Sequence, residues 1–180
     1  MKHRIVLISA ALIFGVLLYF QTDWKWFLLL LVLISGIVSW GVFDIRQNYF
    51  VESFSSKKQM TEREIALTFD DGPTEFTPQF LEILKKHNAT ATFFCIGKQI
   101  EKHPEIFREI IQNGYEVGNH TFSHSNQNGF YGSEKVTDEI LKTDEIMLKT
   151  AEIKTELFRP PFGITNPHIA KAIEKTAKKS

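Results

Sequence analysis

The sequence has very little cysteine and no excess of charge. Of its 180 residues only Cys95 is a cysteine, which excludes an internal disulfide framework and a cysteine-rich zinc site. Cys95 stands in an apolar stretch, where a small buried side chain is expected. The 21 basic residues balance the 21 acidic ones, so the overall charge does not favour nucleic acid and we expect no nucleic-acid partner. The length allows one ordinary domain and a smaller segment.

Charge is missing altogether from two apolar stretches, residues 5–20 and 27–43. Each is slightly shorter than the roughly 20 residues that cross a bilayer, and the flanking aromatic residues Tyr19, Trp24, Trp26 and Trp40 extend both. Neither stretch has a polar face, which disfavours two core helices of a soluble protein. A secretory signal peptide fits less well, because "LLYFQTD" has no small-x-small cleavage site. We predict that residues 1–45 form a two-helix membrane anchor.

The rest of the chain divides into a connecting segment and a folded domain. Residues 46–62 are polar and irregular and are predicted to be a linker. From residue 63 to residue 180, apolar strand-like segments alternate with helical patterns. The predicted strands are 65–69, 89–97, 115–119 and 156–158, and the predicted helices are 77–87, 103–114, 133–150 and 166–179. This order indicates the α/β class with a parallel sheet, either open or closed into a barrel.

Five polar residues follow the predicted strands. Asp70 and Asp71 follow the first strand, His120 and His124 the third, and Arg159 the fourth. Because chemistry in such folds collects at the carboxyl ends of the strands, we expect the five side chains to converge.

Two histidines and one carboxylate make a three-ligand site that suits Zn²⁺ and leaves a position open for water. His120 and His124, four residues apart, are able to converge in a helix or in a tight loop. One of the two aspartates would be the third ligand, and its partner would be free to act as a general base. The other histidines lack partners at a useful spacing: His3, His87, His103 and His168.

Four stretches in this order and spacing carry a family resemblance: "TFDDGP", "ATFFCIG", "GYEVGNHTFSH" and "FRPPFG". Together they resemble the NodB-type polysaccharide deacetylases, carbohydrate esterase family 4, over roughly residues 63 to 180. The resemblance implies a distorted (β/α) barrel. It also implies removal of acetyl groups from a glycan such as peptidoglycan, chitin or xylan with the help of a divalent metal, Zn²⁺ or Co²⁺.

The resemblance also assigns roles to individual positions. It makes Asp70 the catalytic base and Arg159 the residue that holds the base carboxylate. The metal ligands it implies are Asp71, His120 and His124. It implies a groove wall made of Pro160, Pro161, Phe162 and Gly163, with the main-chain N–H of Phe162 helping to hold the oxyanion.

Two further motifs of the family, one with Asp-Trp and one with Leu-x-His, do not follow "FRPPFG" in this chain. The histidine of the second is the family's general acid, and His168 does not stand in that context. We therefore expect a truncated, partial barrel with an unpaired edge, low stability and reduced activity. Two alternatives remain: an inactive membrane-anchored remnant that binds only metal or glycan, and a metal-dependent amidohydrolase for a small amide.

The expected location is a cell membrane, through more than one span. The basic residues at both ends of the apolar region favour both ends in the cytoplasm: Lys2, Arg4, Arg46, Lys57 and Lys58. A cell-wall glycan requires the domain outside the cytoplasm, so we expect an extracytoplasmic domain on substrate grounds alone. The expected partners are thus an acetylated glycan and a lipid bilayer.

Overall fold

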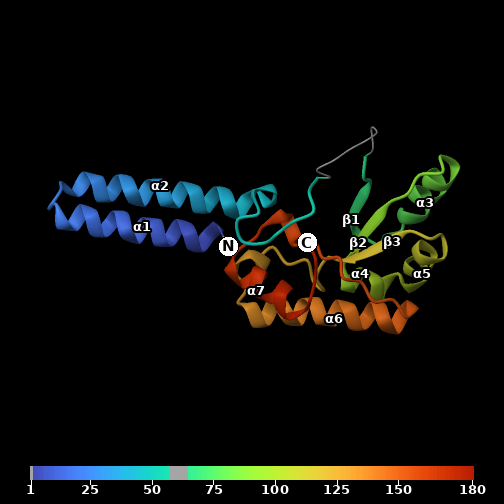
Figure 1. Ribbon diagram of the computed structural model, residues 1–180. Coiled ribbons are helices and arrows are strands. Elements are labelled where there is room, and N and C mark those ends of the chain that lie inside the picture. Colours follow the sequence, from blue (N-terminus) through green and yellow to red (C-terminus); the bar gives the residue numbers. More distant parts are fainter. Residues whose placement is uncertain (1, 57–64) are drawn as a thin grey trace.

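The computed structural model describes residues 2–56 and 65–180. Its first two helices, α1 (Lys2–Tyr19) and α2 (Trp24–Phe43), lie side by side and project away from the rest of the chain (Figure 1). The rings of Phe14 and Phe27 meet edge to face between them, 5.2 Å apart. Mean hydropathy reaches 1.6 in α1 and 2.3 in α2, and almost none of their residues are buried. By length and composition both are candidate membrane spans, although a signal sequence passes the same test.

The domain is built on a parallel sheet, as predicted. Its strands are β1 (Thr68–Gly72), β2 (Thr92–Cys95) and β3 (Glu116–Asn119), in the order β1-β2-β3. Phe69 pairs with Phe93, which pairs in turn with Val117. The strand predicted at 65–69 is shifted: β1 begins at Thr68 and includes both aspartates.

The strand predicted at 156–158 is reduced to single bridges. Phe158 pairs with Asn119, and Leu157 pairs with Lys179 near the end of the chain. Pro160 and Pro161 follow directly and have no N–H to donate, so a ladder cannot continue beyond Arg159. Within the described residues the sheet therefore has three strands and is open.

Five further helices surround the sheet (Figure 1): α3 (Thr77–Lys86), α4 (Gly97–Lys102), α5 (Pro104–Gln112), α6 (Ser133–Ala151) and α7 (Pro167–Lys175). Three short turns are 3₁₀-helical: η1 (Ile45–Gln47), η2 (Asn128–Phe130) and η3 (Pro161–Gly163). The start of α7 agrees with the sequence, since Asn166 caps it through the N–H of Ile169 and Pro167 is its first residue. The helix α4 was not predicted, because Gly97 was assigned to the end of a strand.

Two apolar clusters form the core. The first lies between the sheet and its covering helices and contains Phe93, Phe107, Ile110 and Met147. The second joins α6 and α7 through these buried residues: Val136, Ile140, Phe158, Ile169, Ala172 and Ile173.

The second cluster also contains Val51, from the predicted linker 46–62. The N–H of Phe54 donates to the carbonyl of Ser180 at 2.8 Å, so this stretch also bonds to the end of the chain. The described part of the predicted linker 46–62 thus packs against the domain. The predicted boundary at residues 62 and 63 lies outside the described residues.

Candidate metal centre and active site

Asp70 and Asp71 lie at an irregularity near the end of β1. The register between β1 and β2 shifts between Phe69 and Gly72, and Asp71 has a left-handed backbone with φ of 67°. Such a bulge changes the direction in which consecutive side chains point. The two carboxylates consequently meet different partners rather than each other.

His120 and His124 lie in a tight loop directly after β3, and not in a helix. The buried Asn119 begins this loop: its side-chain oxygen accepts from the N–H of Thr121, and its amide donates to the carbonyl of Ile140. Thr121 then accepts from the N–H of His124 through its hydroxyl, at 3.2 Å. Thr121 and His124 both have positive φ, 64° and 46°, which turns the chain tightly enough to bring the two imidazoles to one side.

These elements bring Asp71, His120 and His124 together. The Oδ1 atom of Asp71 lies 3.5 Å from Nε2 of His120 and 3.2 Å from Nε2 of His124. One ligand atom from each of the three residues lies within 4.8 Å of the others. The predicted ligand set thus converges, and its one carboxylate and two imidazoles are donors that suit Zn²⁺.

The protonation of His120 favours a cation at this point. Its Nδ1 atom lies 2.6 Å from the carbonyl oxygen of Arg159, and a carbonyl only accepts, so Nδ1 carries the proton. Burial lowers the pKa of His120 and so favours the neutral imidazole. Its Nε2 lone pair then faces the carboxylate of Asp71, and two acceptors repel unless a cation lies between them. The arrangement of the residues therefore fits a metal ion.

Asp70 has a partner of its own in Arg159. The guanidinium Nη1 atom donates to Oδ1 of Asp70 at 2.7 Å and to the hydroxyl of Thr68 at 2.9 Å. The guanidinium also lies over the ring of Phe94, 4.0 Å from its centre. Phe94 fits there because residue 118 is glycine: a Cβ atom on Gly118 would lie 2.4 Å from its ring.

The predicted groove residues follow Arg159 and bring Phe162 next to His124. Pro161, Phe162 and Gly163 form η3, and Phe162 has a φ of 60°. The ring of Phe162 lies 4.9 Å from that of His124, and more than half of its surface is exposed. Pro160 and Pro161 are buried and fix the chain directly before Phe162. Of the predicted groove residues, Phe162 therefore lies directly beside the three candidate metal ligands.

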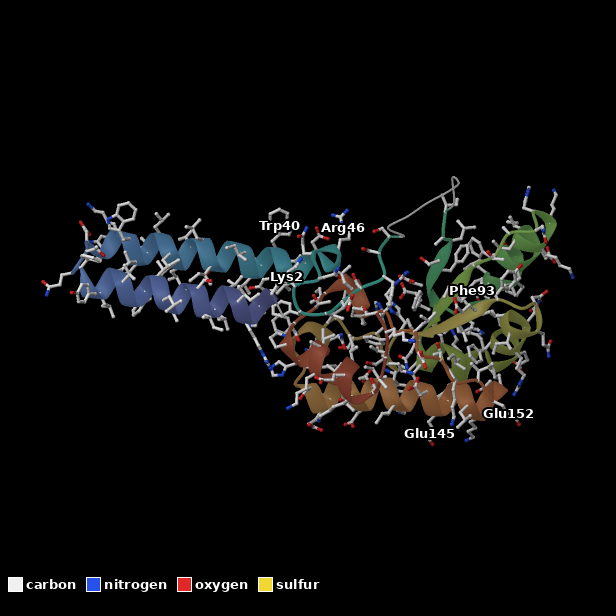
Figure 2. The ribbon with its side chains drawn as sticks, viewed as in Figure 1. Lys2, Trp40, Arg46, Phe93, Glu145 and Glu152 are labelled. Atoms are coloured by element: carbon white, nitrogen blue, oxygen red, sulfur yellow. The ribbon has the colours of Figure 1, made fainter. Side chains whose placement is uncertain are left out.

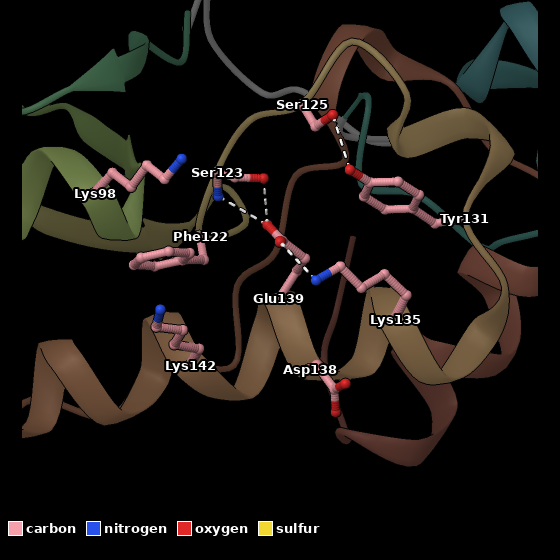
Figure 3. Close-up of a pocket in the computed structure, with 9 residues that line it drawn as sticks. All are labelled: Lys98, Phe122, Ser123, Ser125, Tyr131, Lys135, Asp138, Glu139 and Lys142. Carbon is pink, nitrogen blue, oxygen red and sulfur yellow. Dashed lines mark hydrogen bonds and ion pairs between the residues drawn. The ribbon is translucent and has the colours of Figure 1, made fainter.

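Sequence reasoning missed a buried carboxylate that supports the histidine loop, Glu139 on α6 (Figure 3). Its Oε2 atom accepts from the N–H of Ser123 at 2.7 Å and from the hydroxyl of Ser123 at 2.8 Å. Tyr131 donates to the hydroxyl of Ser125 at 2.9 Å, so both neighbours of His124 are held. One signal was available, because Glu139 stands on the apolar face of α6 that also contains Val136 and Ile140.

The loop also has a hollow of about 540 Å³ on its α6 side. Lys142 lies there with its Nζ atom 3.5 Å from the centre of the Phe122 ring, and Lys98 lies at 5.7 Å (Figure 3).

Cys95 is completely buried, as predicted, and burial raises the pKa of its thiol. His3 lies outside this site, and its Nδ1 atom is 3.3 Å from the hydroxyl of Tyr49.

The family model for polysaccharide deacetylases matches residues 57–179, well over half of the chain. The chain belongs to the polysaccharide deacetylase family. A peptidoglycan-N-acetylglucosamine deacetylase of Bacillus cereus is 40% identical over 126 residues, covering 69% of this chain and 44% of that protein. The resemblance seen in the sequence is thereby confirmed.

Solved structures agree with this assignment. A crystal structure of a peptidoglycan N-acetylglucosamine deacetylase matches with a TM-score of 0.62 and 38% identity, over 66% of this chain and 56% of that one. A CE4 family pseudoenzyme from Bacillus anthracis matches with a TM-score of 0.61 and 28% identity, over 66% of this chain and 42% of that one. The chain thus spans about half, or less, of the length of these polysaccharide deacetylase relatives.

Proposed function

We propose that this protein is a membrane-anchored, metal-dependent deacetylase that removes acetyl groups from a polysaccharide. The observation that carries the proposal is the pair of contacts around two adjacent aspartates. Asp71 lies beside His120 and His124, while Asp70 is held by Arg159. One carboxylate is thereby available to a metal and the other to a proton, which are the two requirements of metal-assisted amide hydrolysis.

Asp71, His120 and His124 would hold the divalent metal, for which Zn²⁺ is the first candidate and Co²⁺ the second. When bound, the metal supplies Lewis acidity and lowers the pKa of a water molecule in its coordination sphere. The hydrogen bond from Nδ1 of His120 to the carbonyl of Arg159 orients the imidazole and fixes its tautomer.

Asp70 is the proposed general base, which accepts a proton from the attacking water. Arg159 orients its carboxylate through an ion pair, with Nη1 of Arg159 2.7 Å from Oδ1 of Asp70. The main-chain N–H of Phe162 is proposed to stabilise negative charge on the acetyl oxygen. Pro160, Pro161, Phe162 and Gly163 would form one wall of the glycan groove.

The proposed organisation of the chain is an anchor (1–45), a connecting segment (46–62) and a deacetylase domain (63–180). The apolar surfaces of α1 and α2 support insertion into a bilayer. The domain is proposed to lie on the extracytoplasmic side on substrate grounds alone, because relatives are named for peptidoglycan. The proposed substrate class is an acetylated glycan, of which peptidoglycan is the first candidate because relatives are named for it. Chitin-like and xylan-like glycans are the other candidates.

A second candidate function is binding without catalysis. It is favoured by the similarity to a CE4 family pseudoenzyme, which indicates that the fold alone does not guarantee activity.

The test uses the full chain in lipid nanodiscs, loaded with Zn²⁺ or Co²⁺. Acetate release is measured from chito-oligosaccharides, from peptidoglycan and from a small N-acetyl amide, with Asp70→Asn as the matched variant. Release from a glycan that Asp70→Asn abolishes supports the deacetylase. Release only from the small amide makes the protein an amidohydrolase, and metal binding without release makes it a binding protein.

A further inference from the structure

The loop that follows the groove residues is hydrogen-bonded to the end of α2. The N–H of Thr165 donates to the carbonyl of Val42 at 3.0 Å, and its hydroxyl donates to the carbonyl of Gly41 at 3.2 Å. The last four carbonyls of a helix have no partner within the helix, and Thr165 supplies a partner to two of them. Thr165 is 2% exposed, so the two bonds are shielded from water.

The contacts between the helix pair and the domain extend beyond Thr165. Tyr49 packs so closely beneath Gly41 that a Cβ atom there would lie 2.4 Å from its ring. The hydroxyl of Tyr49 lies 3.3 Å from Nδ1 of His3, near the start of α1. The Nζ atom of Lys2 donates to the carbonyl of Gln47 at 2.5 Å (Lys2 is labelled in Figure 2). Both helices are thus attached to the domain by packing and hydrogen bonds, and not by a free tether.

The end of α2 that meets the domain is also the end expected at a membrane surface. A helix of 20 residues is about 30 Å long, which equals the thickness of the hydrocarbon core. Trp24 and Trp26 lie at its far end, and the exposed Trp40 and Phe43 at its near end, where aromatic side chains favour the headgroup region. The carbonyls that Thr165 binds are therefore at headgroup level.

The candidate metal centre lies close to this level. Thr165 is three positions after Phe162 in the sequence, so their Cα atoms are at most about 11 Å apart. The ring of Phe162 is in turn 4.9 Å from that of His124. The candidate metal centre is therefore held near the lipid surface. The contacts that join α1 and α2 to the domain prevent the centre from moving away from the membrane.

A second exposed aromatic residue lies beside the same loop. Phe130 in η2 is 91% exposed. Its neighbour Gly129 accepts a hydrogen bond from Asn166 at 2.8 Å, one residue beyond Thr165. A phenylalanine without cover at the height of the headgroups is suited to insertion between lipids.

From this geometry we infer that the substrate is an N-acetylated saccharide attached to a membrane lipid, rather than a polymer distant from the membrane. The inference rests on the proposed deacetylase function and on α1 and α2 crossing a membrane. Water adds to the amide carbonyl, the C–N bond breaks, and the products are acetate and a free amine on the lipid-linked sugar. A saccharide held in the same bilayer stays at the height of the site, which raises its effective concentration.

The test compares two substrates in one preparation of the full chain in Zn²⁺-loaded proteoliposomes. One is N-acetylglucosaminyl diacylglycerol within the same bilayer, and the other is a soluble chito-oligosaccharide at equal total concentration. We expect acetate release from the lipid-linked sugar to be faster by about tenfold or more. Equal rates, or a faster rate on the soluble sugar, overturn the inference and leave the proposed function intact. Release from neither substrate overturns the proposed function itself.

Insertion variants test the height of the site directly. A rigid helical spacer after Asp44, of about 30 residues, raises the domain by about 45 Å, whereas a Gly-Ser spacer of equal length leaves it free to return. We expect the rigid spacer to reduce the rate of acetate release from the lipid-linked sugar about tenfold or more. The rate on the soluble sugar should stay unchanged. The flexible spacer should reduce the rate on the lipid-linked sugar by less. The inference is contradicted if the two spacers reduce the rate on the lipid-linked sugar equally, or if the rigid spacer reduces the rates on both substrates equally.

A point substitution tests the same inference without inserting a spacer. Phe130→Ala is expected to slow release from the lipid-linked sugar severalfold and to leave the soluble sugar unaffected. The matched control is Ile83→Ala, which removes an exposed apolar side chain from α3, on the side of the domain away from α1 and α2 (Figure 1). The inference fails if the two variants lose the same fraction of the rate of acetate release from the lipid-linked sugar.

Discussion

The guanidinium group of Arg159 lies 2.7 Å from the carboxylate of Asp70, and both side chains are only partly buried. The main-chain carbonyl of the same arginine accepts a hydrogen bond from His120. One residue therefore positions the proposed base with its side chain and a proposed metal ligand with its backbone. This division permits the two roles to be separated by mutation.

Arg159→Lys is expected to reduce the rate of acetate release and to leave metal affinity unchanged. Lysine keeps the positive charge and the carbonyl that holds His120, but it loses the planar guanidinium that lies over the ring of Phe94 and aims Nη1 at Asp70. Loss of such a supporting contact typically costs about 10- to 100-fold in activity. Kinetics and a Zn²⁺ titration on the same samples check both parts. A large loss of Zn²⁺ affinity would show that the side chain supports the metal site itself.

Zn²⁺ is expected to stabilise the protein against heat. A ligand that binds only the folded state at 100 times its dissociation constant adds about 2.7 kcal/mol. For a chain of this size that corresponds to a rise of about 2 to 4 °C in Tm per kcal/mol. Thermal unfolding with and without Zn²⁺ measures the rise, and His124→Ala, which removes one of the three donors, should abolish it. A rise of the same size in that variant would place the metal elsewhere.

Motifs in the sequence were sufficient to predict that the three candidate metal ligands converge. Asp70, Asp71, His120, His124 and Arg159 all follow apolar segments, and the carboxyl ends of neighbouring parallel strands meet at one edge. The tight loop was one of the two geometries that the spacing of His120 and His124 allowed. The parallel sheet and the capped start of α7 were also predicted, because periodicity and capping are local signals.

The features that the sequence did not predict depend on distant contacts. Val51 has no periodic neighbours that mark it as core, and its partners lie on α6 and α7. Glu139 stands on the apolar face of α6, but the sequence does not indicate its partner Ser123, which lies 16 positions earlier. The bonds from Thr165 to α2 join residues more than 120 positions apart. Single-sequence patterns do not report such pairs.

The stability of the metal-free protein is expected to fall with pH below about 6.5. Burial lowers the pKa of His120 in the folded state relative to the ordinary value of about 6.5. Between the two pKa values the unfolded chain binds more protons, so the free energy of unfolding decreases as pH falls, by up to about 1.4 kcal/mol per pH unit. Thermal unfolding in a chelator at several pH values checks this. His120→Gln keeps a donor for Arg159 but does not titrate, so its Tm should depend less on pH. An equal pH dependence in the two proteins contradicts the assignment.

Glu139→Gln is expected to weaken Zn²⁺ binding without unfolding the protein. The carboxylate accepts two hydrogen bonds from Ser123 through a single oxygen, and an amide places a weaker acceptor, or a donor, at that point. His124 directly follows Ser123, so a displaced loop moves one proposed ligand away from the other two. Loss of support of this kind costs about 10- to 100-fold in metal affinity.

The matched control for Glu139→Gln is Asp138→Asn, one residue earlier on the same helix, where the carboxylate points away from the loop (Figure 3). Zn²⁺ titration by calorimetry compares the two variants, and circular dichroism verifies that both remain folded. Equal affinities for the two variants would mean that the loop holds His124 in place through Thr121 and Asn119 alone. A specific loss in Glu139→Gln would instead make α6 a structural support of the metal centre, which the motif residues by themselves do not reveal.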